Sequence, residues 1–164
     1  HIPDLKKDSI CYGADIDCTT IQWCRKAIDS VYFDCIEQET LPYPSNYFHL
    51  VYGISVLTHI SHTATQYWLI ELKRVLEPNG IAIISTHGTH YFHQLSQEQK
   101  KQLLQEGTIS NANKQAGSRS KTTYHEASHF KKILEDHFNI IEFWDGHQFP
   151  QKMGGQDCWI IRKK

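Results

Sequence analysis

The sequence lacks a long hydrophobic run and an excess of charge of one sign. No apolar stretch approaches the roughly 20 residues that a membrane-spanning helix needs, and no secretory signal is visible, so we expect no membrane partner. The formal net charge is -1, from 17 Lys and Arg against 18 Asp and Glu. Nonspecific affinity for nucleic acid comes mainly from clustered basic residues, so we do not expect nucleic acid as a partner.

The sequence also lacks any C-x-x-C pair. Four of the five cysteines fall inside expected strands or helix faces, where free cysteine behaves as a small apolar residue. We therefore expect reduced thiols in a cytoplasmic protein. The cysteines are Cys11, Cys18, Cys24, Cys35 and Cys158.

The length of 164 residues and the 40% of hydrophobic residues indicate one globular domain over residues 1–164. The chain is too short for two comfortable domains. It begins at His1, and its first residues look like the end of an element. We therefore expect a domain that is incomplete at its N-terminus.

The most informative stretch is LPYPSNYFHLVYGISVLTHI, residues 41–60. Its Pro, Ser and Asn residues predict a turn-rich loop, and the β-branched and aromatic residues of 48–52 predict a strand buried on both faces. Gly53 ends that strand. Ligands of open α/β sheets bind outside the carboxyl ends of the strands, so Gly53 and Ser55 are candidate ligand-binding residues.

The rest of the chain alternates between strand and helix patterns, as in a βαβ architecture. Between them, residues 107–123 are rich in Gly, Ser, Asn, Lys and Thr and form a long loop, which is either a substrate lid or disordered. Expected strands are 10–15, 31–36, 81–86, 140–144 and 157–162. Expected helices are 17–28 with Asp17 as N-cap, a helix that Ser61 caps and that Pro78 and Gly80 stop, 96–106 with a Ser-x-x-Gln capping box, and 125–137.

Residues 41–60, followed by WLIELKRVLEPNG at 68–80, resemble the middle of a class I S-adenosylmethionine-dependent methyltransferase. The order is the family's: a loop, a fourth strand, a helix ending in an R-V-L-x-P-x-G turn, and a fifth strand. The resemblance implies a Rossmann-like α/β sheet with helices on both faces and an antiparallel last strand. It also implies S-adenosylmethionine as cofactor and methyl transfer to a small-molecule or sugar-like acceptor.

The resemblance extends to three candidate cofactor-binding residues. In the family, the acid that ends the second strand binds the ribose hydroxyls, and Asp15 matches it; a carboxylate can accept from two vicinal hydroxyls. Ile16 matches the residue that packs on adenine, and Glu37 matches the acceptor for the adenine amino group. The alternatives are a helix-capping role for Asp15 and a solvated loop carboxylate for Glu37.

One family feature is missing from the sequence. The family begins with a strand that runs into a glycine-rich loop against the cofactor's methionine portion, and no G-x-G stretch precedes Asp15. The resemblance therefore implies that the first βα unit, roughly 30 residues, is absent from this chain.

The candidate catalytic residues are histidines. Methyl transfer is an in-line displacement in which the protein orients two reactants, and a hydroxyl acceptor also needs a general base. Histidine suits that task near neutral pH. His59 and His87 follow strands whose carboxyl ends should face the cleft, and either one is a base or a structural hydrogen-bonding residue.

Three other functions remain open. The same fold could serve as a non-catalytic binding module, and an acid after the second strand also binds the ribose of NAD in oxidoreductases. The sequence holds no Tyr-x-x-x-Lys pair of the short-chain dehydrogenase kind. The spacing His87-x-x-His90-x-x-His93 resembles a metal site, but no Cys or HExxH partner supports it, so we expect no metal ligands. The oligomeric state is not readable.

Overall fold

The computed structural model describes residues 9–36, 40–110 and 121–164. The contacts within the chain divide it into two compact units, residues 1–43 and residues 44–164. Among the described residues, unit 1 has a two-stranded sheet, and unit 2 has a four-stranded sheet and a two-stranded sheet. Glu37 lies outside the described residues, so its predicted role in binding adenine remains a prediction.

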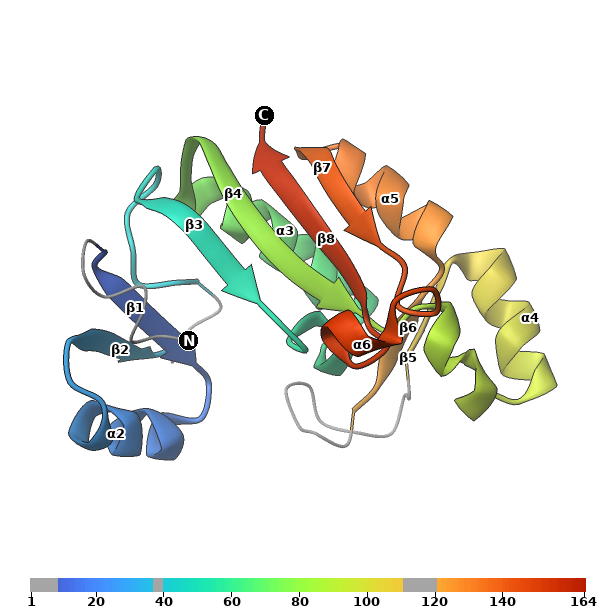
Figure 1. The fold of residues 1–164 in the computed structure, drawn as a ribbon, viewed down its shortest axis with the longest axis horizontal. Coiled ribbons are helices and arrows are strands. Elements are labelled where there is room, and N and C mark those ends of the chain that lie inside the picture. The colour runs from blue at the N-terminus through green and yellow to red at the C-terminus, as the bar shows by residue number, and fades with distance from the viewer. Residues whose placement is uncertain (1–8, 37–39, 111–120) are drawn as a thin grey trace. The chain divides into compact units, whose positions relative to one another are not determined.

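Unit 1 is the βαβ unit that the sequence predicts. Strand β1 (Cys11–Asp15) pairs in parallel with β2 (Val31–Cys35), and helix α2 (Cys18–Ala27) connects them (Figure 1). The helix buries one residue, Ile21. The register sets Asp15 beside Cys35, so both strands end at the same level.

Asp17 determines where α2 begins. Its Oδ1 accepts hydrogen bonds from the backbone N–H groups of Thr19 (3.0 Å) and Thr20 (3.1 Å). These N–H groups have no partner within the helix, and an aspartate at the N-cap satisfies them. The predicted capping role of Asp17 is confirmed.

Unit 2 contains a mixed sheet of strand order β3-β4-β8-β7. Strands β3 (Phe48–Gly53) and β4 (Leu76–Thr86) are parallel. Strand β8 (Asp157–Lys163) is antiparallel both to β4 and to β7 (Phe138–Trp144). The predicted antiparallel last strand is confirmed.

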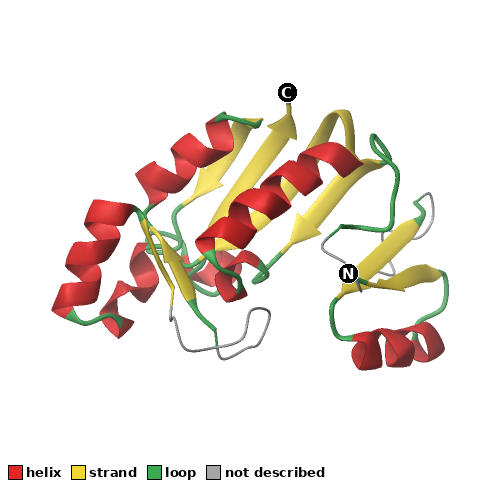
Figure 2. Ribbon diagram, turned by 180° about the vertical axis from the view of Figure 1, so that it is seen from behind, coloured by secondary structure: helices red, strands yellow, loops and turns green. Residues whose placement is uncertain are grey.

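Helices α3 (His62–Val75) and α5 (Ala127–Glu135) lie against the same face of this sheet (Figure 2). The Ser61 hydroxyl caps α3 by accepting from the N–H of Ala64, as its position before the helix predicts. Apolar side chains from both helices and from three strands form one buried core. Its largest fully buried members are Leu69, Leu76, Ile84, Phe130, Leu134, Phe138 and Ile161, and Trp159 at 2% exposure.

A second, smaller core lies beside α4 (Gln97–Glu106). Ser96 and Gln99 form the predicted capping box at the start of α4. The helix leads into β5 (Thr108–Ser110), which pairs antiparallel with β6 (Thr123–His125). Of the loop predicted over residues 107–123, residues 111–120 lie outside the described residues, and the flanks form this two-stranded sheet.

Three short elements complete the described fold: the 3-10 helices η1 (Leu57–His59) and η2 (Thr89–Gln94), and helix α6 (Pro150–Met153). They are too short to carry a hydrophobic period, which is why the sequence pattern did not predict them. Across the described residues, no helix has both the length and the apolar character that spanning a membrane requires.

Candidate functional site

In unit 1, strand β1 ends at Asp15, whose carboxylate is exposed to solvent. Asp15 is exposed, and its Oδ1 accepts from the backbone N–H of Asp17 at 2.8 Å. Its Oδ2 accepts no hydrogen bond from the described residues. Ile16, the next residue, is 54% exposed. A carboxylate oxygen and an apolar side chain are therefore consecutive and open, which fits the binding of a ribose hydroxyl and of an adenine ring.

Both carboxylate oxygens of Asp17, two residues further on, already accept hydrogen bonds within the protein. Its Oδ2 accepts from the Thr20 hydroxyl at 2.6 Å, and its Oδ1 caps α2. These hydrogen bonds, that of the Thr20 side chain first, lower the pKa of Asp17. The two nearby carboxylates therefore differ. Asp17 caps α2, whereas Asp15 Oδ2 accepts no hydrogen bond from the part of the chain that the structure describes.

Unit 1 also contains a disulfide. The structure joins Cys18, the first residue of α2, to Cys35, the last residue of β2. The expectation of reduced thiols is therefore wrong for this pair, because the sequence pattern does not show that the crossover brings the two residues together. Cys11, Cys24 and Cys158 are free.

In unit 2, a ring of three hydrogen bonds among Ser55, Ser85 and Gln156 connects the carboxyl ends of β3 and β4. The Ser55 N–H donates to Ser85 Oγ (2.7 Å), and Ser85 Oγ donates to Gln156 Oε1 (2.6 Å). The ring closes where Gln156 Nε2 donates to Ser55 Oγ (3.0 Å). It holds Ser55 in the left-handed backbone region, at φ 61°. Gly53, which ends β3 beside Ile84, leads directly into this turn.

His59 follows this turn, at the end of η1. Its Nδ1 lies 2.7 Å from the backbone carbonyl oxygen of Lys121. A carbonyl can only accept, so Nδ1 carries the proton of the neutral ring and Nε2 keeps a lone pair. His59 is only half-buried. A neutral imidazole held in this tautomer can accept a proton at Nε2.

His87 follows β4 and is more buried than His59. Its ring packs against Tyr91 (4.2 Å between ring centroids) and against Tyr124 (5.7 Å). Burial, and then the charge of the nearby His59, lowers the pKa of His87 to about 4. Its Nδ1 has no hydrogen-bond partner among the described residues. The structure therefore brings the two predicted histidines into one neighbourhood but gives them different environments.

Asp157 is a third titratable group at this edge of the unit 2 sheet. It begins β8 opposite Thr86, and its Oδ1 accepts from the Gly146 N–H at 2.9 Å. Burial, and then the charges of Asp145 and Glu126, raises its pKa to about 6. The carboxyl group occupies the space beside Gly88 that a side chain would otherwise fill.

Ser85, Gln156 and Asp157 were not among the predicted site residues. Gln156 lies 71 residues from Ser85 and 101 residues from Ser55. Nothing in the sequence spacing indicates that they meet, because their convergence depends on the antiparallel pairing of β8 with β4. The available signal was weak: a polar Gln-Asp pair at the start of an otherwise apolar strand.

The predicted histidine spacing does not form a metal site in the described part of the chain. There, no group of three or more His, Cys, Asp or Glu side chains is placed to hold a metal ion. His90 and His93 have ring centroids 6.3 Å apart, and His93 Nδ1 instead lies 2.8 Å from the His90 carbonyl oxygen.

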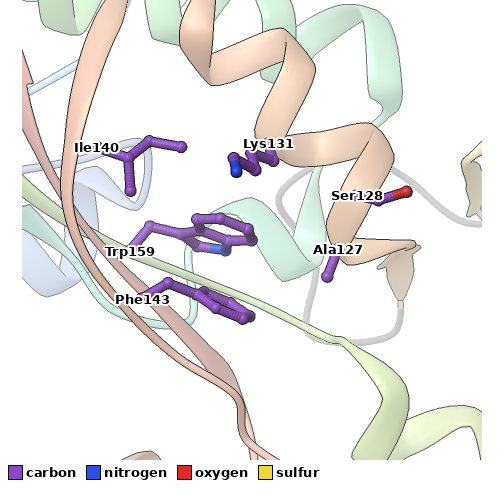
Figure 3. A pocket seen from close by; sticks show the side chains of 6 residues that line it. All are labelled: Ala127, Ser128, Lys131, Ile140, Phe143 and Trp159. Atoms are coloured by element: carbon purple, nitrogen blue, oxygen red, sulfur yellow. The ribbon is translucent and has the colours of Figure 1, made fainter.

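An apolar hollow of about 300 Å³ lies between α5 and the strands β7 and β8 (Figure 3). Lys131 of α5 and Ile140 of β7 face each other across it, above the rings of Phe143 and Trp159, which are tilted by 31° with centroids 4.1 Å apart. It contains no carboxylate or imidazole. We therefore assign the chemistry to the edge where β3 and β4 end, and not to this hollow.

The family model described as "Methyltransferase domain" matches residues 2–84. No curated protein sequence gives a significant match.

Solved structures show the same fold at low sequence identity. A S-adenosylmethionine-dependent methyltransferase from Methanosarcina mazei has a TM-score of 0.65 at 16% identity, over 93% of this chain and 81% of that chain. A protein from Pyrococcus horikoshii has a TM-score of 0.70 at 15% identity, over 99% of this chain and 74% of that one.

The third relative was solved with its ligands. It is the 1,6-didemethyltoxoflavin-N1-methyltransferase of Burkholderia thailandensis, with 1,6-didemethyltoxoflavin and S-adenosylhomocysteine bound. Its TM-score is 0.67 at 14% identity, over 99% of this chain and 65% of that chain.

Proposed function

The chain belongs to the class I S-adenosylmethionine-dependent methyltransferase family, and from this premise we propose that it methylates a hydroxyl group of a small-molecule, sugar-like acceptor. The observation that carries the proposal is the fixed tautomer of His59, whose Nδ1 donates to the Lys121 carbonyl. A base at this position suits an acceptor that must lose a proton as it attacks.

We assign the cofactor's ribose to Asp15 and the adenine ring to Ile16. No described residue donates a hydrogen bond to Asp15 Oδ2, and a charge-assisted hydrogen bond from a hydroxyl to a carboxylate is stronger than one between neutral groups. In unit 2, taken by itself, Gly53 and Ser55 remain candidate cofactor-binding residues. The rigid Ser55–Ser85–Gln156 ring supports this, because a pre-organised site loses less entropy on binding.

When bound, S-adenosylmethionine supplies an electrophilic methyl group on a sulfonium. The work of this chain is to orient the acceptor and to take up its proton. His59 Nε2 accepts that proton, and the Lys121 carbonyl then stabilises the imidazolium by keeping its hydrogen bond to Nδ1–H.

His87 is less suited to be the base. With a pKa of about 4, it is neutral at pH 7 but holds a proton only weakly, so proton transfer to it has little driving force. Its packing against Tyr91 and Tyr124 favours a positioning role at the end of β4. Of the two predicted catalytic histidines, we therefore propose His59 as the base.

The acceptor class rests on two features. The net charge of -1 offers no general basic surface for nucleic acid, and the relative from Burkholderia thailandensis carries a small-molecule ligand. A hydroxyl-bearing small molecule requires the base that His59 can provide, whereas a strongly nucleophilic thiolate would not.

The test is transfer of a labelled methyl group from S-adenosylmethionine to a panel of small hydroxyl compounds, sugars among them. His59→Gln should lower kcat at least tenfold, and the pH dependence of kcat assigned to the base should disappear. The matched control is His93→Gln, an exposed histidine, which should keep the wild-type rate. Equal rates for His59→Gln and His93→Gln would contradict the assignment.

A further inference from the structure

Cys18 and Cys35 meet at one end of unit 1. They are 17 residues apart in the chain, yet their Cα atoms are 5.1 Å apart and the structure joins them in a disulfide. This Cα separation lies within the range in which two cysteines bond without backbone movement. Both residues are half-buried, so small oxidants and reductants can reach them.

The disulfide flanks the residues that we assign to the cofactor. Asp15 is the register partner of Cys35, and the Asp15 carbonyl accepts from the Ile36 N–H at 2.9 Å. On the other side, the Cys18 N–H donates to the Ile16 carbonyl at 3.1 Å. The bond therefore connects the two backbone segments on either side of Asp15 and Ile16.

We propose that Cys18 and Cys35 form a reversible oxidation site that controls how tightly the Asp15–Ile16 edge binds S-adenosylmethionine. The inference rests on the proposed function. The oxidised pair ties the start of α2 to the end of β2 and so fixes the turn that carries Asp15 and Ile16. A pre-ordered turn loses less conformational entropy when the ligand binds, so the oxidised form binds more tightly.

The oxidant can be a small-molecule disulfide. One cysteine thiolate attacks a sulfur of that disulfide, forms a mixed disulfide and releases one small thiolate. The second cysteine thiolate then attacks the protein-bound sulfur, forms the Cys18–Cys35 bond and releases the second small thiolate. Two protein sulfurs lose two electrons in total, the small disulfide gains them, and the two released thiolates take up the two protons that the cysteines lost.

The redox state of the surrounding compartment decides whether Cys18 and Cys35 are bonded. Cytoplasmic thiols are kept reduced, and disulfides that form there are commonly transient and redox-sensing. In a reducing compartment the pair is reduced at rest. Oxidative stress would then convert it to the bonded form that the structure contains.

The first experiment maps the bond without using the cofactor. The full chain is equilibrated with dithiothreitol or with oxidised glutathione, and its thiols are counted and its peptides mapped by mass spectrometry. Oxidation should remove two thiols and link the Cys18 peptide to the Cys35 peptide, in the wild type and in Cys24→Ser alike. Cross-links that instead involve Cys11 or Cys24, or none at all, would overturn the proposal.

The second experiment titrates S-adenosylhomocysteine into both redox forms by calorimetry. The oxidised wild type and Cys24→Ser should bind roughly three- to tenfold more tightly than their reduced forms. Cys18→Ser and Cys35→Ser should bind like the reduced wild type under both conditions, and circular dichroism would confirm that they fold. Equal affinity in both forms would overturn redox control alone, whereas no binding in either form would overturn the proposed function as well.

Discussion

At the scale of single residues, position 88 requires glycine because there is no room for a side chain. Its backbone conformation does not require glycine. Its φ is -99°, which any residue adopts. A Cβ built on Gly88 would lie 1.9 Å from Asp157 Oδ2. That carboxyl group cannot simply turn away, because its Oδ1 accepts from the Gly146 N–H and the residue is buried. Gly88 therefore lets β4, β8 and the loop after β7 approach each other.

We predict that Gly88→Ala destabilises the protein by about 1–3 kcal/mol, the usual cost of forcing an extra methyl group into a packed interior. Urea unfolding measures the change. The matched control is Gly53→Ala, where the added Cβ would meet only Val56 Cγ2, at an ordinary 3.7 Å. A Gly88→Ala variant as stable as Gly53→Ala would contradict this explanation.

At the scale of elements, strand β6 ends in a buried histidine. His125 is fully buried and packs on Phe130, with its Nδ1 3.1 Å from Thr108 Oγ1. Its Nε2 has no partner among the described residues. Burial, followed by the charges of His62, His129 and His87, lowers the pKa of His125 to about 3. The strand is therefore compatible with a neutral ring only.

The sign of the pH effect follows from that shift. Below the ordinary pKa of 6.5 the unfolded chain binds a proton at His125 and the folded chain does not. The contribution of neutral His125 to the free energy of unfolding is therefore complete above pH 6.5 and is lost as the pH falls from 6.5 toward 3. Asp157 acts in the opposite direction, because its raised pKa favours the fold at low pH and costs stability as the pH rises through 6.

We predict that His125→Gln removes roughly 2 kcal/mol of the stability loss between pH 7 and pH 5. The measurement is urea unfolding at the two pH values, and the quantity compared is the difference between them, so a general destabilisation by the variant cancels. The exposed His93→Gln serves as control and should keep the wild-type difference. The same pH dependence in all three proteins would show that His125 is not responsible.

The helix caps were predictable from the sequence, whereas the contacts between distant elements were not. The capping roles of Asp17, Ser61 and Ser96 were readable because a cap acts on residues two or three positions away. The Ser85–Gln156 contact and the Cys18–Cys35 bond were not readable, because each depends on a strand register or a crossover that sequence periodicity does not encode.

The ends of elements were less predictable than their existence. Helix α3 ends at Val75, and β4 already begins at Leu76, where it pairs with Phe48, whereas the sequence pattern placed the strand from residue 81. Tertiary pairing with β3 decided this boundary. Likewise His125, predicted as the first residue of a helix, belongs to β6, because it pairs with Thr108 and Glu126 caps α5 instead.

At the scale of the whole molecule, each unit holds its own candidate residues. Unit 1 holds Asp15 and Ile16, and unit 2 holds the Ser55 turn and His59. The fold class was predictable from the order of strands and helices. The choice between the two histidines required the structure, because only the structure places His59 Nδ1 against the Lys121 carbonyl and buries the His87 ring.

The most direct test of the account is calorimetric titration of S-adenosylhomocysteine into the wild type, Asp15→Asn and Asp17→Asn. Asparagine caps helices as well as aspartate does, so Asp17→Asn removes a charge beside the site while α2 keeps its start. We predict that Asp15→Asn weakens binding by roughly ten- to a hundredfold, the value of a hydrogen bond to a charged group, and that Asp17→Asn stays within about twofold of the wild type. No binding by the wild type, or equal weakening in both variants, would contradict the assignment of the cofactor to the end of β1.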